Sequence, residues 1–194
     1  MIFNQKKNGW NLNFEFKENE LVYSLVTSTE KSKTKISYLE ITGDSWEHIR
    51  RNEWYRNVGL LWLVIGIYMN VVMYLDIKSL APSIWLILGV VMLVIYKVRE
   101  INFLVLGAGS NNILIIKDSS CEEIYNLLLE KRKDSVLKTY GSINFDNPLD
   151  VEVGKFKVLL DQEFIDKKKY EEVVKELNDY HKNIPVLSPI TSFK

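Results

Sequence analysis

VGLLWLVIGIYMNVVMYL at residues 58–75 and LAPSIWLILGVVMLVIY at residues 80–96 decide the architecture of this chain. Neither run contains a charged side chain, and the short polar segment DIKS separates them. Because a helix rises about 1.5 Å per residue, each run approaches the ~30 Å hydrocarbon core of a bilayer. Backbone groups find no water there, so each run has to form its own hydrogen bonds as a helix. The sequence therefore predicts a transmembrane helical hairpin, with spans at about residues 58–76 and 80–97.

Charged residues are concentrated outside the hairpin. The 194 residues include 25 Lys and Arg and 25 Asp and Glu, so the formal net charge is zero, which gives no support for nucleic-acid binding. About 150 residues outside the spans are enough for one small domain and an appendage. The single cysteine, Cys121, excludes an internal disulfide and fits a reducing compartment. Its acidic neighbours Glu122 and Glu123 disfavour a reactive thiolate.

Segments typical of β-strands lie on both sides of the hairpin. They are residues 10–17, 21–27, 35–41, 101–106 and 112–117. Their alternation, or their content of β-branched and aromatic residues, is typical of strands with a buried face. Apolar residues then recur at helical spacing as far as about Lys133, which predicts an amphipathic helix that covers the strands. The hairpin is therefore expected to interrupt one cytoplasmic α+β domain, formed by residues 1–43 and 99–139.

Aromatic and basic side chains flank both spans. Asp44 and Glu47 have capping-box spacing, which predicts a helix from about Ser45 into the first span. Residues 44–98 would then form an interfacial helix plus the hairpin. Trp and Tyr rings settle at the headgroup layer, and Arg and Lys extend their charges to it. The residues expected at the membrane interface are Trp46, Arg50, Arg51, Trp54, Tyr55, Arg56, Lys97 and Arg99. The alternative, that the arginines are ordinary solvent-exposed charges, stays open.

The distribution of positive charge predicts an orientation. Three arginines precede the first span, and Lys97 and Arg99 follow the second, whereas the joining turn holds only Asp76 and Lys78. The positive-inside rule places both flanks in the cytoplasm. We therefore expect a multi-pass protein of the bacterial inner membrane with cytoplasmic N- and C-termini.

Asn70 is the one strongly polar side chain within the spans. Polar residues in a membrane mark either helix contacts or functional paths. For Asn70 the sequence favours an interhelical or oligomer hydrogen bond, and a transport path is the less favoured interpretation. Gly59, Gly66 and Gly89 permit close approach of helices, although they form no GxxxG motif.

The C-terminal region has a different pattern. Residues 140–150 resemble a loop, and the apolar positions that follow outline two short helices, the second capped by Asp166. We expect a helical pair at residues 150–182 and an extended tail at residues 183–194.

Three segments in this order carry a resemblance to a known family. They are the charged approach WEHIRRNEWYRN (46–57), the strand end NILIIKDSS (112–120) and the helix EEIYNLLLEKR (122–132). Over about residues 10–133 the chain resembles small bacterial membrane proteins with a PH-like domain. In those proteins a transmembrane pair interrupts the strands, and the last β-hairpin leads to an amphipathic helix. The resemblance implies an α+β membrane protein, with a PH-like antiparallel sheet and amphipathic helix split by the hairpin.

A second resemblance concerns the C-terminal segment FKVLLDQEFIDKKKYEEVVKEL (156–177). It is similar to the short helical pairs called SHOCT-like modules, although KKKYEE departs from the usual acidic start of their second helix. Together the two resemblances imply membrane-tethered scaffolding or oligomer contacts, and no particular reaction.

A search for catalytic and metal-binding motifs gives no candidate. His48 and His181 lie far apart, and no cysteine or carboxylate cluster has metal-ligand spacing. GxSxG, P-loop and HExxH motifs are missing from the sequence. A strand-like run follows Gly107–Ala108–Gly109 where a dinucleotide loop needs a helix. We therefore expect no cofactor.

The leading functional hypothesis is a non-enzymatic inner-membrane protein. Its PH-like domain would act as a membrane-tethered scaffold or protein-interaction module, with the lipid bilayer and a protein partner or second copy as partners. The alternative is a membrane effector or immunity protein that acts by oligomerisation in, or blocking of, a pore. An enzyme of unknown type is a third, weaker possibility.

Overall fold

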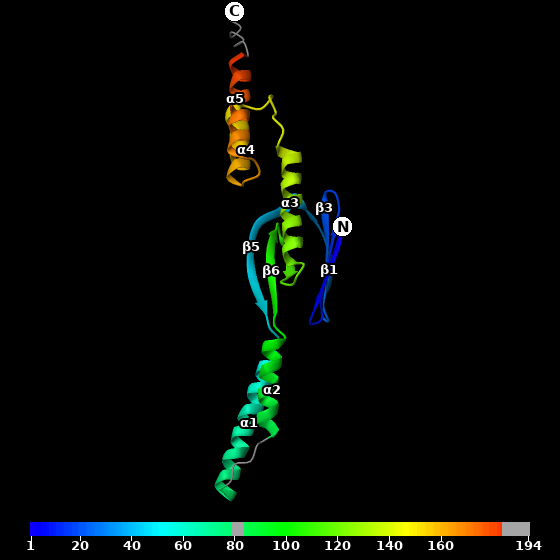
Figure 1. The fold of residues 1–194 in the computed structure, drawn as a ribbon, viewed down its shortest axis with the longest axis vertical. Coiled ribbons are helices and arrows are strands. Elements are labelled where there is room, and N and C mark those ends of the chain that lie inside the picture. The colour runs from blue at the N-terminus through cyan, green and yellow to red at the C-terminus, as the bar shows by residue number, and fades with distance from the viewer. Residues whose placement is uncertain (79–83, 184–194) are drawn as a thin grey trace, which may run out of the picture. The chain divides into compact units, whose positions relative to one another are not determined.

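The computed structural model describes residues 1–78 and 84–183 (Figure 1). Within these residues it is an α+β fold with two antiparallel sheets and five α-helices. The chain divides into two compact units, residues 1–126 and residues 127–194.

The first sheet contains four strands in the order β1-β2-β3-β4. They are β1 (Ile2–Lys7), β2 (Trp10–Phe16), β3 (Glu20–Val26) and β4 (Lys31–Ser37). The alternation predicted for residues 10–17 is confirmed, because Leu12, Phe14 and Phe16 all face the core. Strand β1 is an addition to the prediction. It pairs with β2 across a two-residue turn, in which Asn8 and Gly9 adopt φ angles of 50° and 84°.

The third predicted strand is shifted. Sequence alternation placed it at residues 35–41, whereas β4 begins at Lys31 and ends at Ser37. A short 3₁₀ helix, Tyr38–Glu40, follows it, capped by the Ser37 hydroxyl. The fully buried Tyr38 ring anchors this turn, and its hydroxyl donates to the Lys17 carbonyl at 2.9 Å.

The second sheet has the order β5-β6-β7 and consists of β5 (Ile41–Arg50), β6 (Ile101–Ala108) and β7 (Asn111–Ile116). The helix predicted from about Ser45 is wrong, because this segment is the outer strand β5. Its residues pair with β6 from Ser45 opposite Leu106 to Arg50 opposite Ile101. The apolar strand β6 needs a neighbour on each side, and this distant pairing overrides the local helix-capping pattern.

Two helices occupy the connection between the paired strands β5 and β6. Helix α1 runs from Glu53 to Ile77 and helix α2 from Ile84 to Val98. The apolar runs are therefore helical where they are described. The remainder of the predicted second span, residues 80–83, lies outside the described residues. Figure 1 shows both helices continuing from the ends of the two strands.

Helices α1 and α2 pack through the glycines that the sequence singled out. A Cβ atom on Gly66 would lie 2.7 Å from the Leu86 Cγ atom, and one on Gly89 would lie 2.8 Å from the Leu63 Cγ atom. One on Gly59 would lie 3.1 Å from the Gly89 carbonyl oxygen. The prediction that these glycines permit close approach is confirmed, since a side chain at any of them would push the helices apart.

Gln5 joins the two sheets inside the first unit. The residue is buried, with 2% of its surface exposed. The Nε2 atom donates to the Ile116 carbonyl at 2.9 Å, and the Oε1 atom accepts from the Ile116 amide at 2.8 Å. The side chain therefore bonds β7 much as another strand would. Strand β1 is held against β7 in this way, and apolar side chains of both sheets fill one core.

Helix α3 (Cys121–Tyr140) follows β7. Ile124 in its first turn is fully buried, and the Tyr125 hydroxyl lies 3.5 Å from the Ser45 hydroxyl. The sequence predicted the end of this helix at about Lys133, which is wrong by two turns. Val136 and Leu137 extend the helix because they pack on the core of the second unit.

The second unit contains α4 (Leu149–Asp161) and α5 (Lys167–Asn183), where the sequence predicts a helical pair. Phe156, Leu159, Phe164, Val173 and Leu177 form its core. The predicted cap is present, since the Asp166 carboxylate accepts from the Lys169 amide at 2.7 Å. Residues 184–194 of the predicted tail lie outside the described residues.

Candidate functional site

The candidate site lies where the paired strands continue into the helices. Arg50 of β5 is opposite Ile101 of β6, and two residues later the Asn52 side chain starts α1 by accepting from the Trp54 amide at 3.0 Å. The sheet register therefore fixes both the beginning of α1 and the end of α2. Basic and aromatic side chains from both chain segments gather around this junction.

Arg51, Glu100 and Lys97 form one ionic cluster at the junction. The Arg51 Nε and Nη2 atoms each lie 3.0 Å from the Glu100 Oε2 atom, and the Lys97 Nζ atom lies 3.1 Å from it. The hydrogen bond from Lys97, followed by that from Arg51, holds the pKa of Glu100 below its ordinary value. Arg51 also lies over the Tyr96 ring, 5.8 Å from its centroid. The cluster ties the entry to α1 to the exit from α2.

Arg99 and Tyr55 make a second link between the two segments. The Arg99 Nη1 atom donates to the Tyr55 hydroxyl at 2.8 Å, and its guanidinium lies 5.6 Å from the centroid of the Tyr55 ring. Trp54 packs edge-on against Tyr55, with ring centroids 5.2 Å apart. The Asn8 side chain, from the β1–β2 turn, donates to the Arg99 carbonyl at 3.0 Å. The sequence analysis missed Asn8, which lies about ninety positions before Arg99 in the chain.

Arg56 lies just inside α1. It forms an ion pair with Glu53 and donates to the Asn57 side chain at 3.3 Å. The Tyr96 hydroxyl of α2 donates to the same Glu53 carboxylate at 3.3 Å. Arg56 is thus neutralised locally by a residue one turn earlier.

Trp46 and Arg50 are placed by strand β5. The Arg50 guanidinium lies over the Trp10 ring, 4.8 Å from its centroid, and Trp10 packs edge-on against Phe103. Trp46 is 47% exposed, but it lies four residues before Arg50, which is about 13 Å along a strand. The structure therefore groups seven of the eight expected interface residues at the junction and leaves Trp46 farther from the helices. Trp10 is a further member that the sequence analysis did not single out.

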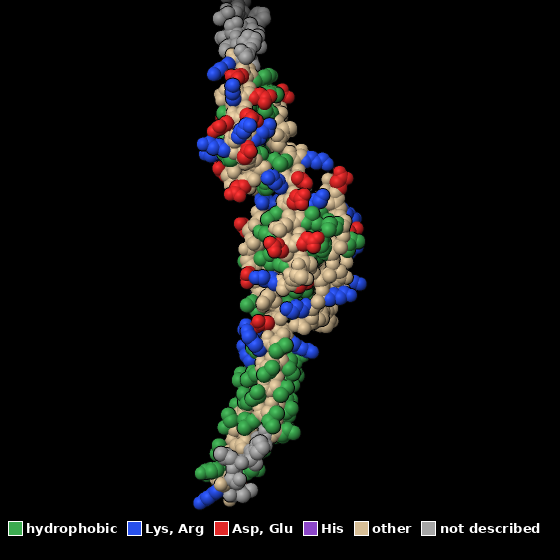
Figure 2. Space-filling model, viewed as in Figure 1, with side chains coloured by type: hydrophobic (Ala, Val, Ile, Leu, Met, Phe, Trp, Pro, Cys, Tyr) green, Lys and Arg blue, Asp and Glu red, His purple; other side chains and the backbone are tan. Residues whose placement is uncertain are grey.

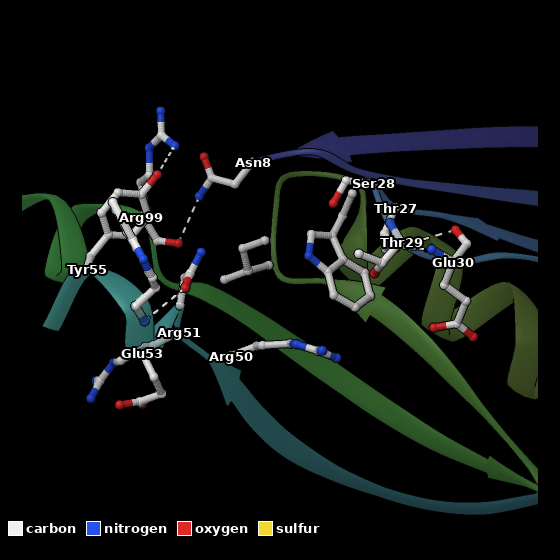
Figure 3. A pocket seen from close by; sticks show the side chains of 14 residues that line it. Asn8, Thr27, Ser28, Thr29, Glu30, Arg50, Arg51, Glu53, Tyr55 and Arg99 are labelled. Carbon is white, nitrogen blue, oxygen red and sulfur yellow. Dashed lines mark hydrogen bonds between the residues drawn. The ribbon is translucent and has the colours of Figure 1, made fainter. Parts of the chain in front are cut away.

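A hollow of about 380 Å³ opens beside the junction (Figure 3). It will be called the junction pocket. Its walls come from the β1–β2 turn, the β3–β4 turn, the link between β5 and α1, and the link between α2 and β6. Arg50, Arg51 and Arg99 all line it, together with the hydroxyl-bearing turn Thr27–Thr29.

The surfaces of α1 and α2 are strongly apolar and exposed. Side chains such as Val64 and Leu75 are 64% and 71% exposed, and only 11% of the most apolar part of α1 is buried. Figure 2 shows hydrophobic side chains covering this pair, with basic side chains where it meets the sheets. Among the described residues, α1 is the one helix long and apolar enough to cross a membrane. A core helix of a soluble protein would be mostly buried instead.

Asn70 makes a hydrogen bond within its own helix. Its Nδ2 atom donates to the Gly66 carbonyl at 2.9 Å, one turn back in α1. The interhelical bond expected from the sequence is not what the structure gives. The bond uses one N–H of this amide group beside the close approach of Gly66 and Leu86.

The described residues give little support for a metal site, a reactive thiol or a dinucleotide-binding loop. No group of three or more His, Cys, Asp or Glu side chains in residues 1–78 and 84–183 could hold a metal ion. Burial raises the pKa of the Cys121 thiol, and the Asp118 carboxylate raises it further, which agrees with an unreactive thiol. Strand β7 begins two residues after Gly109, as the argument against a dinucleotide loop requires.

Comparisons of the chain with known protein families, with curated proteins and with solved structures gave no match.

Proposed function

We propose that this chain is a non-enzymatic interaction module anchored in the bacterial inner membrane, with α1 and α2 as its transmembrane hairpin. The exposed apolar surface of this helix pair carries the proposal. A soluble monomer rarely exposes a contiguous apolar surface of more than a few hundred Å². Helix α1, with 25 residues, is about 37 Å long and exceeds the ~30 Å hydrocarbon core. The described part of α2, Ile84–Val98, accounts for about 22 Å of the second span.

The junction supports an orientation with both termini in the cytoplasm. Because β5 and β6 are adjacent antiparallel strands, α1 begins and α2 ends on the same side of the membrane. Arg50, Arg51 and Arg99 gather on that side, and the positive-inside rule assigns such a side to the cytoplasm.

The strand order supports a PH-like domain. Sheets of four and three antiparallel strands, followed directly by α3, fit the expected sheet-and-helix architecture better than the five strands predicted from sequence. In this proposal the membrane hairpin replaces the turn between β5 and β6. The helical pair α4–α5, proposed as SHOCT-like, has a core of its own. It offers a second unit for a protein partner or another copy of the chain.

The pore hypothesis gains no comparable support. It relied on Asn70 and the glycines as contacts between subunits. The Asn70 amide bonds within α1, and Gly59, Gly66 and Gly89 are used in packing α1 on α2. Liposomes that contain the purified protein should therefore keep background permeability to ions and small dyes.

The proposal is tested by removing the hairpin. Arg50 and Ile101 are directly opposite each other, so residues 51–100 can be replaced by Asn-Gly, a two-residue hairpin turn. The full chain should stay in the membrane pellet after alkaline extraction, and the shortened chain should be soluble, with the circular dichroism of a folded α+β domain. A full chain released by alkali, or a shortened chain that still sediments with membranes, would contradict the proposal.

A further inference from the structure

We propose that the junction pocket binds the phosphate group of an anionic phospholipid headgroup. This inference rests on the proposed membrane anchoring and adds a specific ligand to it. The pocket includes the first turn of α1, which is the start of the candidate span. A ligand in the pocket would therefore lie at the level of the lipid headgroups.

The charges of the pocket favour an anion. Among the residues that the structure describes, no carboxylate lies within ion-pair distance of Arg50 or Arg99. Arg50 stacks on Trp10, and Arg99 donates to the Tyr55 hydroxyl, so both guanidinium groups are held in place by neutral partners. Stacking and single hydrogen bonds leave most of the five N–H donors of each arginine available for phosphate oxygens.

Two carboxylates also line the pocket, and their positions leave the arginine end positive. Glu53 is paired with Arg56 and accepts from the Tyr96 hydroxyl. Figure 3 shows Glu30 at the opposite end of the pocket from Arg51 and Arg99. The basic end therefore keeps its attraction for an anion.

The β3–β4 turn supplies neutral donors. The Thr27 hydroxyl fixes this turn by accepting from the Glu30 amide at 3.0 Å. Within the described residues the neighbouring Ser28 hydroxyl has no hydrogen-bond partner, and its side chain lines the pocket. The turn therefore adds a neutral donor to the wall of the same pocket that the arginines line.

Lipid phosphate suits the pocket better than free phosphate. Trp54 on the pocket wall is 57% exposed, and Trp10 forms another part of the wall. Tryptophan rings favour the boundary between headgroups and acyl chains. The wall therefore offers contacts to the glycerol and upper acyl chain, which a free phosphate ion lacks.

The test measures lipid binding to the purified full chain by native mass spectrometry in detergent. Phosphatidylglycerol and phosphatidylcholine with identical acyl chains are the probes, and excess inorganic phosphate is the competitor. Phosphatidylglycerol should bind at least about tenfold more tightly, a difference of about 1.4 kcal/mol, because the positive choline group of phosphatidylcholine is repelled by the arginines and offsets the charge of its phosphate. Equal binding of the two lipids, or full displacement of phosphatidylglycerol by inorganic phosphate, would overturn the proposal.

Variants locate the site. The double variant Arg50→Gln/Arg99→Gln should lose the preference for phosphatidylglycerol. Lys6→Gln/Lys33→Gln is the charge-matched control, because both lysines are exposed and lie outside the pocket, and it should keep the preference. Ser28→Asp adds a negative charge on an exposed turn without disturbing the core, so it should also abolish the preference in a fully folded protein. A preference that survives both pocket variants would refute the assignment.

The two proposals fail in different ways. If the chain is extracted by alkali, the membrane anchoring itself is wrong. If it stays in the membrane but binds both lipids equally, the anchoring stands and the headgroup site is wrong.

Discussion

The glycine contacts between α1 and α2 give the sharpest prediction about the hairpin. In Gly66→Ala the new Cβ atom would lie 2.7 Å from the Leu86 Cγ atom and 2.8 Å from its backbone nitrogen. Carbon atoms pack best at about 3.5–4.0 Å, so the helices have to separate by roughly 1 Å. The leucine side chain can rotate away, but its backbone cannot. We expect the overpacking to cost about 1–3 kcal/mol.

Alanine variants at the other glycines should destabilise the protein to different extents. Gly89→Ala should cost as much as Gly66→Ala, because its Cβ atom would lie 2.9 Å from the Leu63 backbone nitrogen. Gly59→Ala, with nearest contacts of 3.1 Å, should cost less. Gly154→Ala is the control, since its Cβ atom meets nothing within 4 Å, and helix propensity should make it neutral or slightly stabilising.

The assay is unfolding in mixed micelles by increasing mole fraction of sodium dodecyl sulfate. Trp62 and Trp85 have ring centroids 6.2 Å apart. In a background with Trp10, Trp46 and Trp54 replaced by Phe, tryptophan fluorescence therefore reports the separation of the helices. The order of destabilisation should be Gly66 and Gly89, then Gly59, then Gly154. If Gly66→Ala and Gly89→Ala unfold like the parent protein, α1 and α2 do not pack through these glycines and the hairpin geometry is wrong.

Three further predictions concern the remaining contacts. Gln5→Leu should destabilise the first unit by about 1–3 kcal/mol, because it leaves the buried amide of Ile116 without a partner, while the Ile116 carbonyl still accepts from the Asp118 amide. Urea unfolding of the chain with residues 51–100 replaced by Asn-Gly measures this, and an unchanged stability would contradict the bridge. Burial raises the pKa of Glu152, but hydrogen bonds from Asn147, Lys155 and the Asn144 backbone outweigh it, so the net pKa is lowered. The second unit should then be most stable above the ordinary glutamate pKa and lose stability as the pH falls through the lower folded-state value, whereas Glu152→Gln should flatten this dependence in acid-titrated circular dichroism. Asn70→Leu should leave membrane insertion and oligomeric state unchanged, and a variant that changes its elution in size-exclusion chromatography would revive the subunit-contact hypothesis.

Much of the fold was accessible from local sequence patterns. The uncharged runs predict α1 and α2, because uninterrupted apolar character is a local property. Strand β1 was also accessible, since Asn8–Gly9 is the typical turn of a two-residue hairpin and was overlooked. Strand β5 was not. Its exposed residues carry a helix-capping pattern, and the partner that makes them a strand lies fifty or more residues away in β6.

The candidate site was likewise predictable from the sequence only in part. Composition alone marked the arginines and aromatic residues beside the spans. Their partners could not be predicted, because Trp10 meets Arg50 and Asn8 meets Arg99 only through the pairing of whole strands. The Ser28 turn likewise joins the pocket through the fold, since nothing in its own sequence indicates an anion site.

The central claim is that α1 and α2 cross a membrane together, with the β-sheet unit on the cytoplasmic side. Single cysteines at Lys78 and Lys33, in a Cys121→Ser background, test it directly, because both lysines are exposed, Lys78 follows α1 and Lys33 lies in the sheet unit. In intact bacterial cells with a permeabilised outer membrane, a membrane-impermeant maleimide should label Lys78→Cys and leave Lys33→Cys unlabelled until the inner membrane is disrupted. Labelling of Lys33→Cys in intact cells, or equal labelling of both, would contradict the account.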